Sequence, residues 1–441
     1  MDTTPFHLIL FALDIFVLGG LFLWLRFRRP AGSERAVYQF ERSLYVPAAA
    51  PVRRPSFLWD MSGVALFGGF GLFCFAVLCR AIQTGFAQRN IYPFNVGQCI
   101  AEGIAVHGTL FLAVVAVLLY RSRRRIIATC FGCSALVLAG IGFNMLYWEP
   151  YRLKVEFYEI RTSKVATPVR IVFISDIQTD RIGSHEIDTL KKIQQLNADL
   201  IILGGDYLQT FRGEREERLP EEFRQMFIDH PLEARLGVFA IAGNNSKPGT
   251  SDAELFRDTG IEFAHNTVIH PIPLEDEQDS YIFLVLLSLW HSEGDVTERV
   301  IEPFYQRQGV NLKDIDDFIV MVGHLPNYAV DGYVSPRSGR TVSGYRNADW
   351  APDLMLAGHT HGGQVVLPFY GPIFHWFQPE LYHEHVRQIP RNMWSGFFPY
   401  PNGGHLLITR GTGLERGWAP RIRLFCPPEI SVIDIVPVVP E

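Results

Sequence analysis

The sequence predicts an α/β domain at residues 149–441, preceded by a transmembrane region with four helices at residues 1–148. Long apolar stretches of helical length fill much of the first part. In the second part, short apolar runs alternate with amphipathic helical patterns, which is typical of α/β folds. Five of these runs end in loops that carry Asp, Asn, Gln or His side chains. At 441 residues the chain exceeds one typical domain, so it has room for two unlike parts.

Four apolar stretches have the length of a membrane helix, which needs roughly 20 residues. They cover residues 8–25, 57–78, 100–120 and 126–147. Buried core helices are the alternative explanation. The arginine distribution favours membrane helices, because arginine-rich and arginine-poor connections alternate along this part of the chain.

The same distribution predicts an orientation. The connections after the first and third stretches hold seven and four arginines, whereas the connection after the second holds only Arg80 and Arg89. By the positive-inside rule, the first and third connections are cytoplasmic and the α/β domain is extracytoplasmic. Four basic residues soon after the fourth stretch oppose this orientation: Arg152, Lys154, Arg161 and Lys164. We therefore expect a multi-pass integral membrane protein with its large domain outside the cytoplasm.

The charge balance separates the two parts. Residues 1–148 hold 13 Arg, no Lys and 6 acidic residues, which gives this part a net charge of +7. The whole chain has a net charge of −6, so residues 149–441 carry a net charge of −13. An acidic domain disfavours nucleic acid as a partner, because nonspecific binding of nucleic acid needs a basic surface. Small anionic substrates remain compatible with this domain if a metal ion binds them.

The α/β domain is predicted from eight apolar runs and four helical patterns. Strands are expected at residues 169–174, 200–203, 238–242, 281–289, 318–322, 354–357, 406–409 and 430–436. Helices are expected at residues 184–196, with Ser184 as N-cap, and at 216–229, 252–258 and 296–308. The order fits a mixed sheet or two packed sheets with helices outside. Residues 327–352 read as a long loop, which is often a lid or substrate loop.

The polar loops at the strand ends predict a metal site. His359 and His361 lie two residues apart on a glycine-rich turn, a spacing that suits metal ligands. The other loops carry Asp176, Gln178, Asp206, Asn244, Asn245 and His324. In isolation, each of these residues also has a structural explanation: a helix cap for an aspartate, a left-handed turn for Asn244 and a core position for His324. As a set at strand ends they favour two metal ions bridged by Asp206, which activate water and neutralise a phosphoryl group.

With these residues in place, the chain resembles the calcineurin-like metallophosphoesterase superfamily, and within it the membrane-tethered bacterial branch. The superfamily order is Asp-x-His, Gly-Asp, Gly-Asn-His, Gly-His and Gly-His-x-His, and the resemblance covers about residues 168–436. It implies a two-sheet α/β sandwich flanked by helices. It assigns Asp176, Asp206 and His361 to one metal ion and Asp206, Asn244, His324 and His359 to the other. The implied cofactors are two divalent ions among Mn, Fe, Zn and Mg.

Three residues depart from the superfamily pattern. Gln178 replaces a histidine ligand, and its uncharged oxygen is usually the weaker donor, so we expect the first metal to bind less tightly. Asn245 replaces the histidine that assists the leaving group, and Ser246 replaces the aspartate that commonly orients it. Loss of one acid–base group costs about 10² to 10⁴ in rate, least for a good leaving group such as pyrophosphate. Asn245, His185 and His291 are candidates for the missing catalytic role.

Two functions follow from this pattern. The first is a membrane-anchored, metal-dependent phosphoesterase that hydrolyses a phosphate ester or pyrophosphate with metal-bound hydroxide as nucleophile. Its substrate would be a phosphorylated small molecule or a lipid or envelope precursor, because the resembling superfamily includes hydrolases of UDP-diacylglucosamine. The alternative is a degenerate domain that binds metal or a phosphorylated ligand without efficient turnover, as a receptor or scaffold.

Overall fold

The computed structural model describes the chain between residues 93 and 438. The gaps within this range are residues 122, 210–213, 246–251, 275–279, 290, 292–299, 308, 310–314, 331–332, 335–340, 343, 347–348, 374–388 and 414–420. The chain divides into two compact units, one of which contains Cys99–Phe143 and the other Asn144–Glu441. The predicted apolar stretches at residues 8–25 and 57–78 lie outside the described residues.

Two long apolar helices make up the described part of the first unit. Helix α4 spans Pro93–Arg121 and helix α5 spans Arg125–Phe143. Both are long and apolar enough to cross a membrane, over Ile100–Arg121 and Arg125–Tyr151. They correspond to the third and fourth predicted stretches, and Pro93 starts α4 earlier than predicted because proline is well suited to the first turn of a helix.

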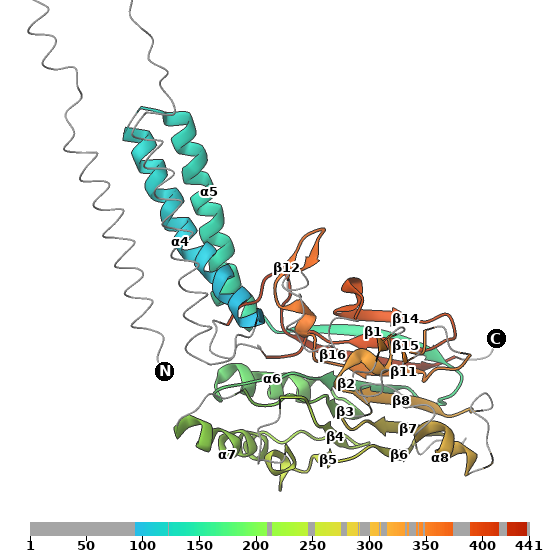
Figure 1. The fold of residues 1–441 in the computed structure, drawn as a ribbon. Coiled ribbons are helices and arrows are strands. Elements are labelled where there is room, and N and C mark those ends of the chain that lie inside the picture. The colour runs from blue at the N-terminus through green and yellow to red at the C-terminus, as the bar shows by residue number, and fades with distance from the viewer. Residues whose placement is uncertain are drawn as a thin grey trace, which may run out of the picture. The chain divides into compact units, whose positions relative to one another are not determined.

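The second unit contains two six-stranded sheets, which Figure 1 shows as two layers. The first sheet has the order β1-β16-β2-β3-β4-β5. Its strands are β1 (Lys154–Thr162), β16 (Glu429–Pro437), β2 (Val169–Ile174), β3 (Leu200–Leu203), β4 (Val238–Ile241) and β5 (Glu262–Ala264). Strands β2 to β5 are parallel, so their carboxyl ends lie at one edge.

The second sheet has the order β14-β15-β11-β8-β7-β6. Its strands are β14 (Gly396–Pro399), β15 (His405–Ile408), β11 (Leu354–Ala357), β8 (Phe318–Gly323), β7 (Tyr281–Leu286) and β6 (Val268–Pro273). Strands β15, β11, β8 and β7 are parallel, whereas the outer strands β14 and β6 are antiparallel to their neighbours. Each sheet therefore brings a row of strand ends to one edge.

The core lies between the sheets. Alternate residues of β2, β3 and β4 pack against alternate residues of β7, β8 and β11, as Phe173, Ile202 and Val320 illustrate. The outer face of the first sheet is covered by helices α6 (Ser184–Gln195) and α7 (Glu214–Asp229), which contribute Ile193 and Phe223 to a second apolar cluster. Strands buried on both faces read as continuous apolar runs, which is why the sequence pattern located them.

The described secondary structure agrees with most predicted elements. All eight predicted strands are present, although the strand that begins at Tyr281 ends at Leu286 and not at residue 289. The N-cap of α6 is Gly183, whose backbone N–H donates to Glu186 Oε2 at 2.9 Å, so Ser184 is the first helical residue and the predicted cap is wrong. The helix predicted at residues 252–258 is a short 3-10 helix, Asp252–Phe256. Within the helix predicted at residues 296–308, the described α-helix is α8, Glu302–Gln306.

Within the two six-stranded sheets, four strands escaped prediction: β1, β5, β6 and β14. Strand β1 is an edge strand rich in charged residues, and strands β5 and β14 are only three and four residues long, so none shows the apolar pattern of a central strand. The predicted loop at residues 327–352 also contains structure. It includes the antiparallel pair β9 (Tyr333–Val334) and β10 (Thr341–Val342).

Candidate metal centre

The predicted site residues lie on loops that follow the carboxyl ends of parallel strands. Asp176 and Gln178 follow β2, Asp206 follows β3 and Asn244 follows β4, all in the first sheet. In the second sheet, His324 follows β8, and His359 and His361 follow β11. Because the two sheets face each other, their strand-end loops meet at one edge, where α/β folds place their sites.

Backbone hydrogen bonds join these loops to one another. The N–H of Asp176 donates to Gly205 O at 3.0 Å, and the N–H of Gln178 donates to Asp206 O at 3.0 Å. Across the sheets, the N–H of His359 donates to both carboxylate oxygens of Asp176 at 3.1 and 3.0 Å. The position of each ligand therefore depends on the neighbouring loop as well as on its own strand.

Left-handed backbone is concentrated on these loops. Positive φ angles occur at Asp176 (54°), Gln178 (32°), Asp206 (55°), His359 (69°), His361 (49°) and Gln364 (50°). A side chain other than glycine rarely adopts this region, and strained residues of this kind cluster at functional sites. Here the strain turns successive side chains back toward a common point.

Glycine is required where two of the loops touch. A Cβ atom at Gly243 would overlap the carboxylate of Asp206, and a Cβ atom at Gly358 would overlap Ser175 Oγ and the carboxylate of Asp176. Glycine permits this close approach because it has no side chain. The Gly-Asn and Gly-His motifs of the sequence therefore have a steric cause.

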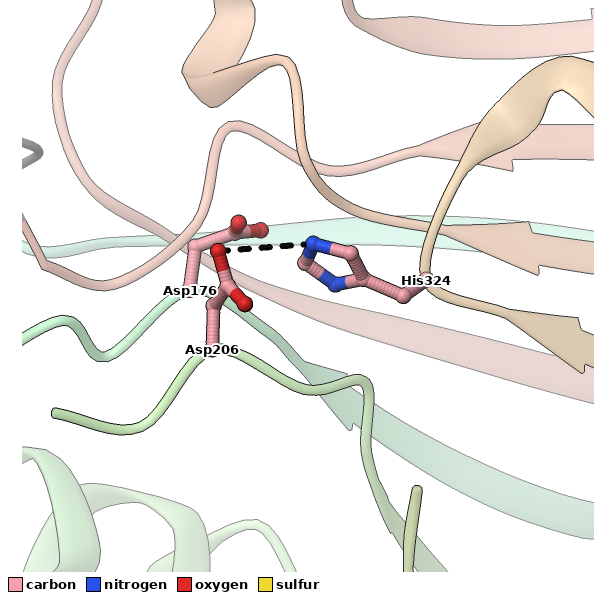
Figure 2. Close-up of side chains that lie close together, drawn as sticks. All are labelled: Asp176, Asp206 and His324. Atoms are coloured by element: carbon pink, nitrogen blue, oxygen red, sulfur yellow. Dashed lines mark ion pairs between the residues drawn. The ribbon is translucent and has the colours of Figure 1, made fainter. Parts of the chain in front are cut away.

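Asp176, Asp206 and His324 form the centre of the site (Figure 2). One ligand atom from each residue lies within 4.8 Å of the others, and all three residues are buried. His324 Nε2 lies 3.4 Å from Asp206 Oδ2, and His324 Nδ1 donates to Gly204 O at 2.8 Å. The second bond fixes the ring so that Nε2 faces the carboxylates, which is how metal-binding histidines are usually oriented.

The two histidines of the glycine-rich turn lie against this centre. The rings of His324 and His359 meet edge to face with centroids 5.2 Å apart. His361 Nε2 lies 3.5 Å from Asp176 Oδ1, although neither buried ring nitrogen of His361 has a hydrogen-bond partner. A buried polar atom without a hydrogen bond is unusual, and a cation would satisfy it.

Gln178 makes a contact that a histidine ligand would not make. Its side-chain Nε2 donates to Asp206 Oδ2 at 2.7 Å, while its buried Oε1 has no hydrogen-bond partner. The amide therefore holds the proposed bridging carboxylate in place and still presents one oxygen.

Asn244 and Asn245 form the exposed side of the site. Asn244 Oδ1 accepts a hydrogen bond from His324 Nε2 at 2.7 Å. The backbone N–H of Asn245 donates to Asp206 Oδ1 at 2.8 Å, which leaves its side chain exposed. Ser246, the third departure from the expected pattern, lies outside the described residues.

The electrostatics of the centre arise from its burial. Burial raises the pKa of the Asp176 carboxyl to about 6, with His324 opposing the shift. Burial is also the largest influence on Asp206, but His324, the Asn245 N–H and His359 together oppose it, so the pKa of Asp206 is lowered well below its ordinary value. For His324, burial is again the largest influence, but Asp206, Asp176 and the bond to Gly204 together raise the pKa to about 9. Burial, followed by the charge of Arg423, lowers the pKa of His361, which keeps that ring neutral and able to bind a metal.

These residues fit divalent metal ions. Two buried carboxylates that face each other repel unless positive charge lies between them. His361 and Gln178 add a ring and an amide oxygen that lack hydrogen-bond partners. Imidazole, carboxylate and amide oxygen together suit Zn, Mn, Fe or Mg without selecting one of them.

The two other histidine candidates are held by nearby loops. His185 Nε2 lies 2.8 Å from Thr412 O, and its ring meets Tyr151 edge to face at 5.8 Å. His291 Nδ1 lies 2.5 Å from Thr267 Oγ1. Neither contact is with the three residues at the centre of the site.

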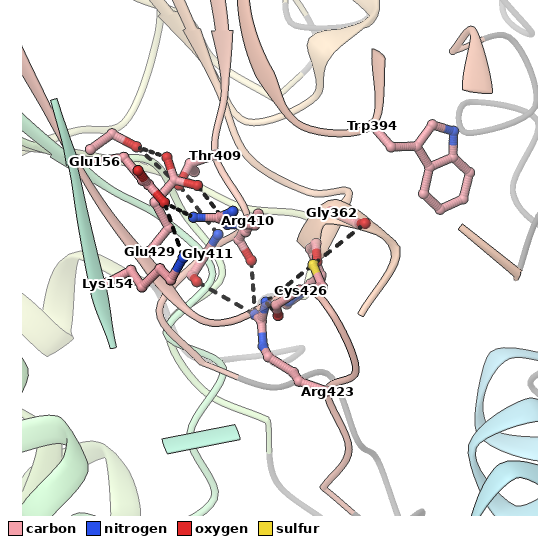
Figure 3. Close-up of polar contacts among 12 residues, drawn as sticks. Lys154, Glu156, Gly362, Trp394, Thr409, Arg410, Gly411, Arg423, Cys426 and Glu429 are labelled. Atoms are coloured by element: carbon pink, nitrogen blue, oxygen red, sulfur yellow. Dashed lines mark hydrogen bonds and ion pairs between the residues drawn. The ribbon is translucent and has the colours of Figure 1, made fainter. Parts of the chain in front are cut away.

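Figure 3 shows Arg423 within a cluster of polar contacts that includes Arg410, Gly411 and Cys426. Arg423 is fully buried, and its guanidinium donates to the carbonyl oxygens of Arg410, Gly413 and Cys426 at 2.8, 2.6 and 3.0 Å. Arg410 and Gly413 lie on the loop that follows β15, and the N–H of Gly413 donates to Asp176 O at 2.9 Å. Arg423 therefore fixes the loop on which the Asp176 backbone rests.

Cys426 links Arg423 to the turn that carries His359 and His361, here named the histidine turn. Its Sγ lies 3.4 Å from His361 O and 3.5 Å from Gly362 O, and its N–H donates to the buried Glu149 Oε1 at 2.6 Å. No sequence pattern indicates Arg423, Cys426 or Glu149, because Cys426 meets Glu149 and His361 across 277 and 65 residues and the acceptors of Arg423 are mainly backbone carbonyl groups. The supporting loop did leave a signal, since Gly411-Thr412-Gly413 follows a predicted strand as the other site loops do.

The part of the chain that carries these loops matches a known protein family. The family model for calcineurin-like phosphoesterases matches residues 169–363, which include the loops after β2, β3, β4, β8 and β11. The match begins at the first residue of β2 and ends two residues after His361. It therefore covers all the candidate metal ligands.

Three bacterial proteins are similar over most of their lengths. An uncharacterized metallophosphoesterase of Bacillus subtilis, YkuE, is 25% identical over 71% of this chain and 97% of its own. The UDP-2,3-diacylglucosamine pyrophosphatase LpxG of Chlamydia muridarum is 27% identical over 68% of this chain and 94% of its own. The phosphodiesterase YaeI of Escherichia coli is 24% identical over 71% of this chain and 99% of its own.

Proposed function

We propose, from the premise that the chain belongs to the calcineurin-like metallophosphoesterase superfamily of metal-dependent phosphoric ester hydrolases, that it cleaves the pyrophosphate of a membrane lipid precursor. The observation that carries the proposal is the buried cluster of Asp176, Asp206 and His324 on the strand-end loops of the two sheets. The substrate class is supported by the similarity to LpxG and by the apolar helices α4 and α5.

The residues present have separate tasks in this hydrolysis. Metal ions held here would supply charge neutralisation for the phosphoryl group and an activated water. Asp206 is the candidate bridging ligand, because Gln178 and the Asn245 backbone hold its two oxygens in fixed directions. Asn244 and Asn245 line the exposed side, so the phosphoryl group would enter past them.

The chemistry at position 245 favours pyrophosphate over simple esters. Asparagine cannot donate a proton to a leaving oxygen as an imidazolium does, but its side-chain N–H groups can donate hydrogen bonds to phosphoryl oxygens. A phosphate leaving group needs little protonation, whereas an alkoxide needs a proton from an acid. The site therefore suits substrates whose leaving group is itself a phosphate.

Hydrolysis by the purified full-length chain in detergent with Mn²⁺ tests the proposal. Two probes are compared, a generic phosphodiester and UDP-2,3-diacylglucosamine, and each is also given to the Asp206→Asn variant. We expect cleavage of the pyrophosphate by the wild type and at least about 100-fold slower cleavage by the variant. Equal inactivity of both proteins with every divalent metal would instead support a domain that binds without turnover.

We also propose that the chain is a multi-pass membrane protein whose phosphoesterase domain is extracytoplasmic. The arginines between α4 and α5, among them Arg121 and Arg123, support a cytoplasmic connection. A cysteine introduced at Ser280 tests the orientation with a membrane-impermeant thiol reagent. Labelling in whole cells is expected, and labelling only after lysis would reverse the topology.

A further inference from the structure

Exposed aromatic residues follow helix α5. Tyr147, Trp148 and Tyr151 are 69, 57 and 42% exposed and lie at the end of the apolar segment Arg125–Tyr151. Tyrosine and tryptophan are enriched where membrane helices meet water, because their rings suit the boundary between acyl chains and headgroups. If α5 spans the membrane, this segment lies at that boundary, since each helical residue advances only about 1.5 Å.

Two further segments lie beside this one. The N–H of Arg423 donates to Met145 O at 3.1 Å, and the N–H of Leu424 donates to Gln364 O at 2.8 Å. The N–H of Val366 in turn donates to Leu424 O at 2.9 Å. Residues 423–426 therefore lie between the end of the apolar segment and the strand that leaves the histidine turn.

Each of these two segments exposes a phenylalanine. Phe425 is 56% exposed, and Phe369, between the short strands β12 (Val366–Leu367) and β13 (Gly371–Pro372), is fully exposed. Both have positive φ, 54° for Phe425 and 65° for Phe369. A bulky residue in this region is strained, and an exposed turn would accommodate glycine or asparagine at lower cost. Exposure and strain together indicate that these rings serve a contact outside the described chain.

We propose that Trp148, Phe369 and Phe425, here named the aromatic surface, insert into the headgroup region of the bilayer and hold the metal centre against the membrane. The occupant is the lipid bilayer, because the aromatic surface is continuous in sequence and in hydrogen bonding with the end of an apolar helix. The exposed Arg152 next to it suits lipid phosphates. This inference rests on the proposed function, since it explains how a lipid-linked pyrophosphate reaches the site.

The consequence concerns the histidine turn. Phe369 lies eight residues after His361, and Gln364 between them accepts a hydrogen bond from Leu424, the residue before Phe425. Contact of the aromatic surface with lipid would place this turn close to the headgroups. A substrate with acyl chains would then reach the metal centre without leaving the bilayer.

Photocross-linking tests the contact independently of catalysis. The full-length chain is reconstituted into vesicles of phosphatidylethanolamine and phosphatidylglycerol that contain a phosphatidylglycerol with a photoreactive group near its headgroup. Peptide mass spectrometry then maps the modified residues. We expect adducts at residues 365–373 and 421–427. Adducts confined to α4 and α5 would overturn the proposal, as would a dimer cross-linked through these segments in place of lipid.

Kinetics with matched variants tests the consequence. Phe369→Ser and Phe425→Ser, each at an exposed position, are expected to slow hydrolysis of UDP-2,3-diacylglucosamine in mixed micelles about 10-fold, the loss that corresponds to one buried aromatic contact. Hydrolysis of a water-soluble phosphodiester should be unchanged. Tyr281→Ser is the control, because Tyr281 is 38% exposed at the amino end of β7, away from the strand ends that carry the site.

The outcomes separate this inference from the proposed function. If every variant hydrolyses both substrates like the wild type, the aromatic surface has no role and the phosphoesterase assignment stands. If no protein hydrolyses either substrate, the proposed function fails and the lipid adducts alone decide whether the surface contacts the membrane.

Discussion

The two sides of the candidate metal centre differ in burial and in the contacts that support their side chains. On the closed side, Asp176 is fully buried and His361 is 1% exposed, and Arg423 and Cys426 support the loops behind them. On the open side, Asn244 and Asn245 are exposed, and Asn245 contacts Asp206 through its backbone. The candidate metal ligands on the closed side thus depend on the fold, whereas the exposed side chain of Asn245 can change without disturbing it.

Metal affinity should respond most to the closed side. We expect His361→Ala to weaken Mn²⁺ binding by more than about 100-fold, and Asn244→Ala by about 10-fold, because the exposed position can admit water as a replacement ligand. Calorimetric titration of the metal-free full-length chain measures both. Equal losses of Mn²⁺ affinity in the two variants would contradict a difference between the closed and open sides.

Stability should depend on the support of the closed side. Arg423→Met removes the donor to three buried carbonyl groups, so we expect the free energy of unfolding to fall by about 3 kcal/mol. Urea unfolding of the chain in detergent measures the change. Arg161→Met, at a side chain 76% exposed, should leave the unfolding curve where it is. A similar curve for Arg423→Met would mean that the buried guanidinium does not stabilise these loops.

Turnover should respond to the open side. Asn245→His restores an imidazole where the superfamily has one, and we expect about 100-fold faster hydrolysis of an alkyl phosphodiester. Hydrolysis of a nucleotide pyrophosphate should rise much less, because its leaving group needs no acid. Asn245→Gln is the control for the change in size. A gain that is equal for both substrates would argue against an acid role at this position.

The smallest effect is expected at Gln178. Replacement by histidine supplies a stronger ligand but removes the amide donor to Asp206 Oδ2, so we expect metal affinity to rise by only about 10-fold. Gln178→Ala removes both contributions and should weaken binding. If the histidine variant bound metal more weakly than the wild type, the amide would matter more as support for Asp206 than as a ligand.

Local sequence patterns are sufficient to predict the central strands and the positions of the candidate ligands. Strand-end loops such as 204–206 and 358–364 combine an apolar run, a glycine and a metal-ligand residue within a few positions, so the seven candidate ligands could be located and all lie at one edge. Their roles as ligands remain predictions.

The support behind the site has no such local pattern. The contact from Cys426 to Glu149 spans 277 residues, and most acceptors of Arg423 are backbone carbonyl groups, which any residue carries. The charged edge strand β1 escaped prediction for a related reason, since its partner in the sheet is β16 and the sequence does not indicate which strand will pair with it.

The position of β16 has a consequence for the synthesis of the protein. Strand β16 lies between β1 and β2, parallel to β1 over nine residue pairs and antiparallel to β2. Strand β1 is synthesised first in the domain, and β16, its partner in the sheet, is synthesised nearly three hundred residues later. Strand β1 can therefore join the sheet only after β16 has been made. While the chain emerges, the loops around Asp176 lack their final neighbours, so the candidate ligands would come together only after synthesis of the domain is nearly finished. A metal ion bound there would therefore enter a completed domain.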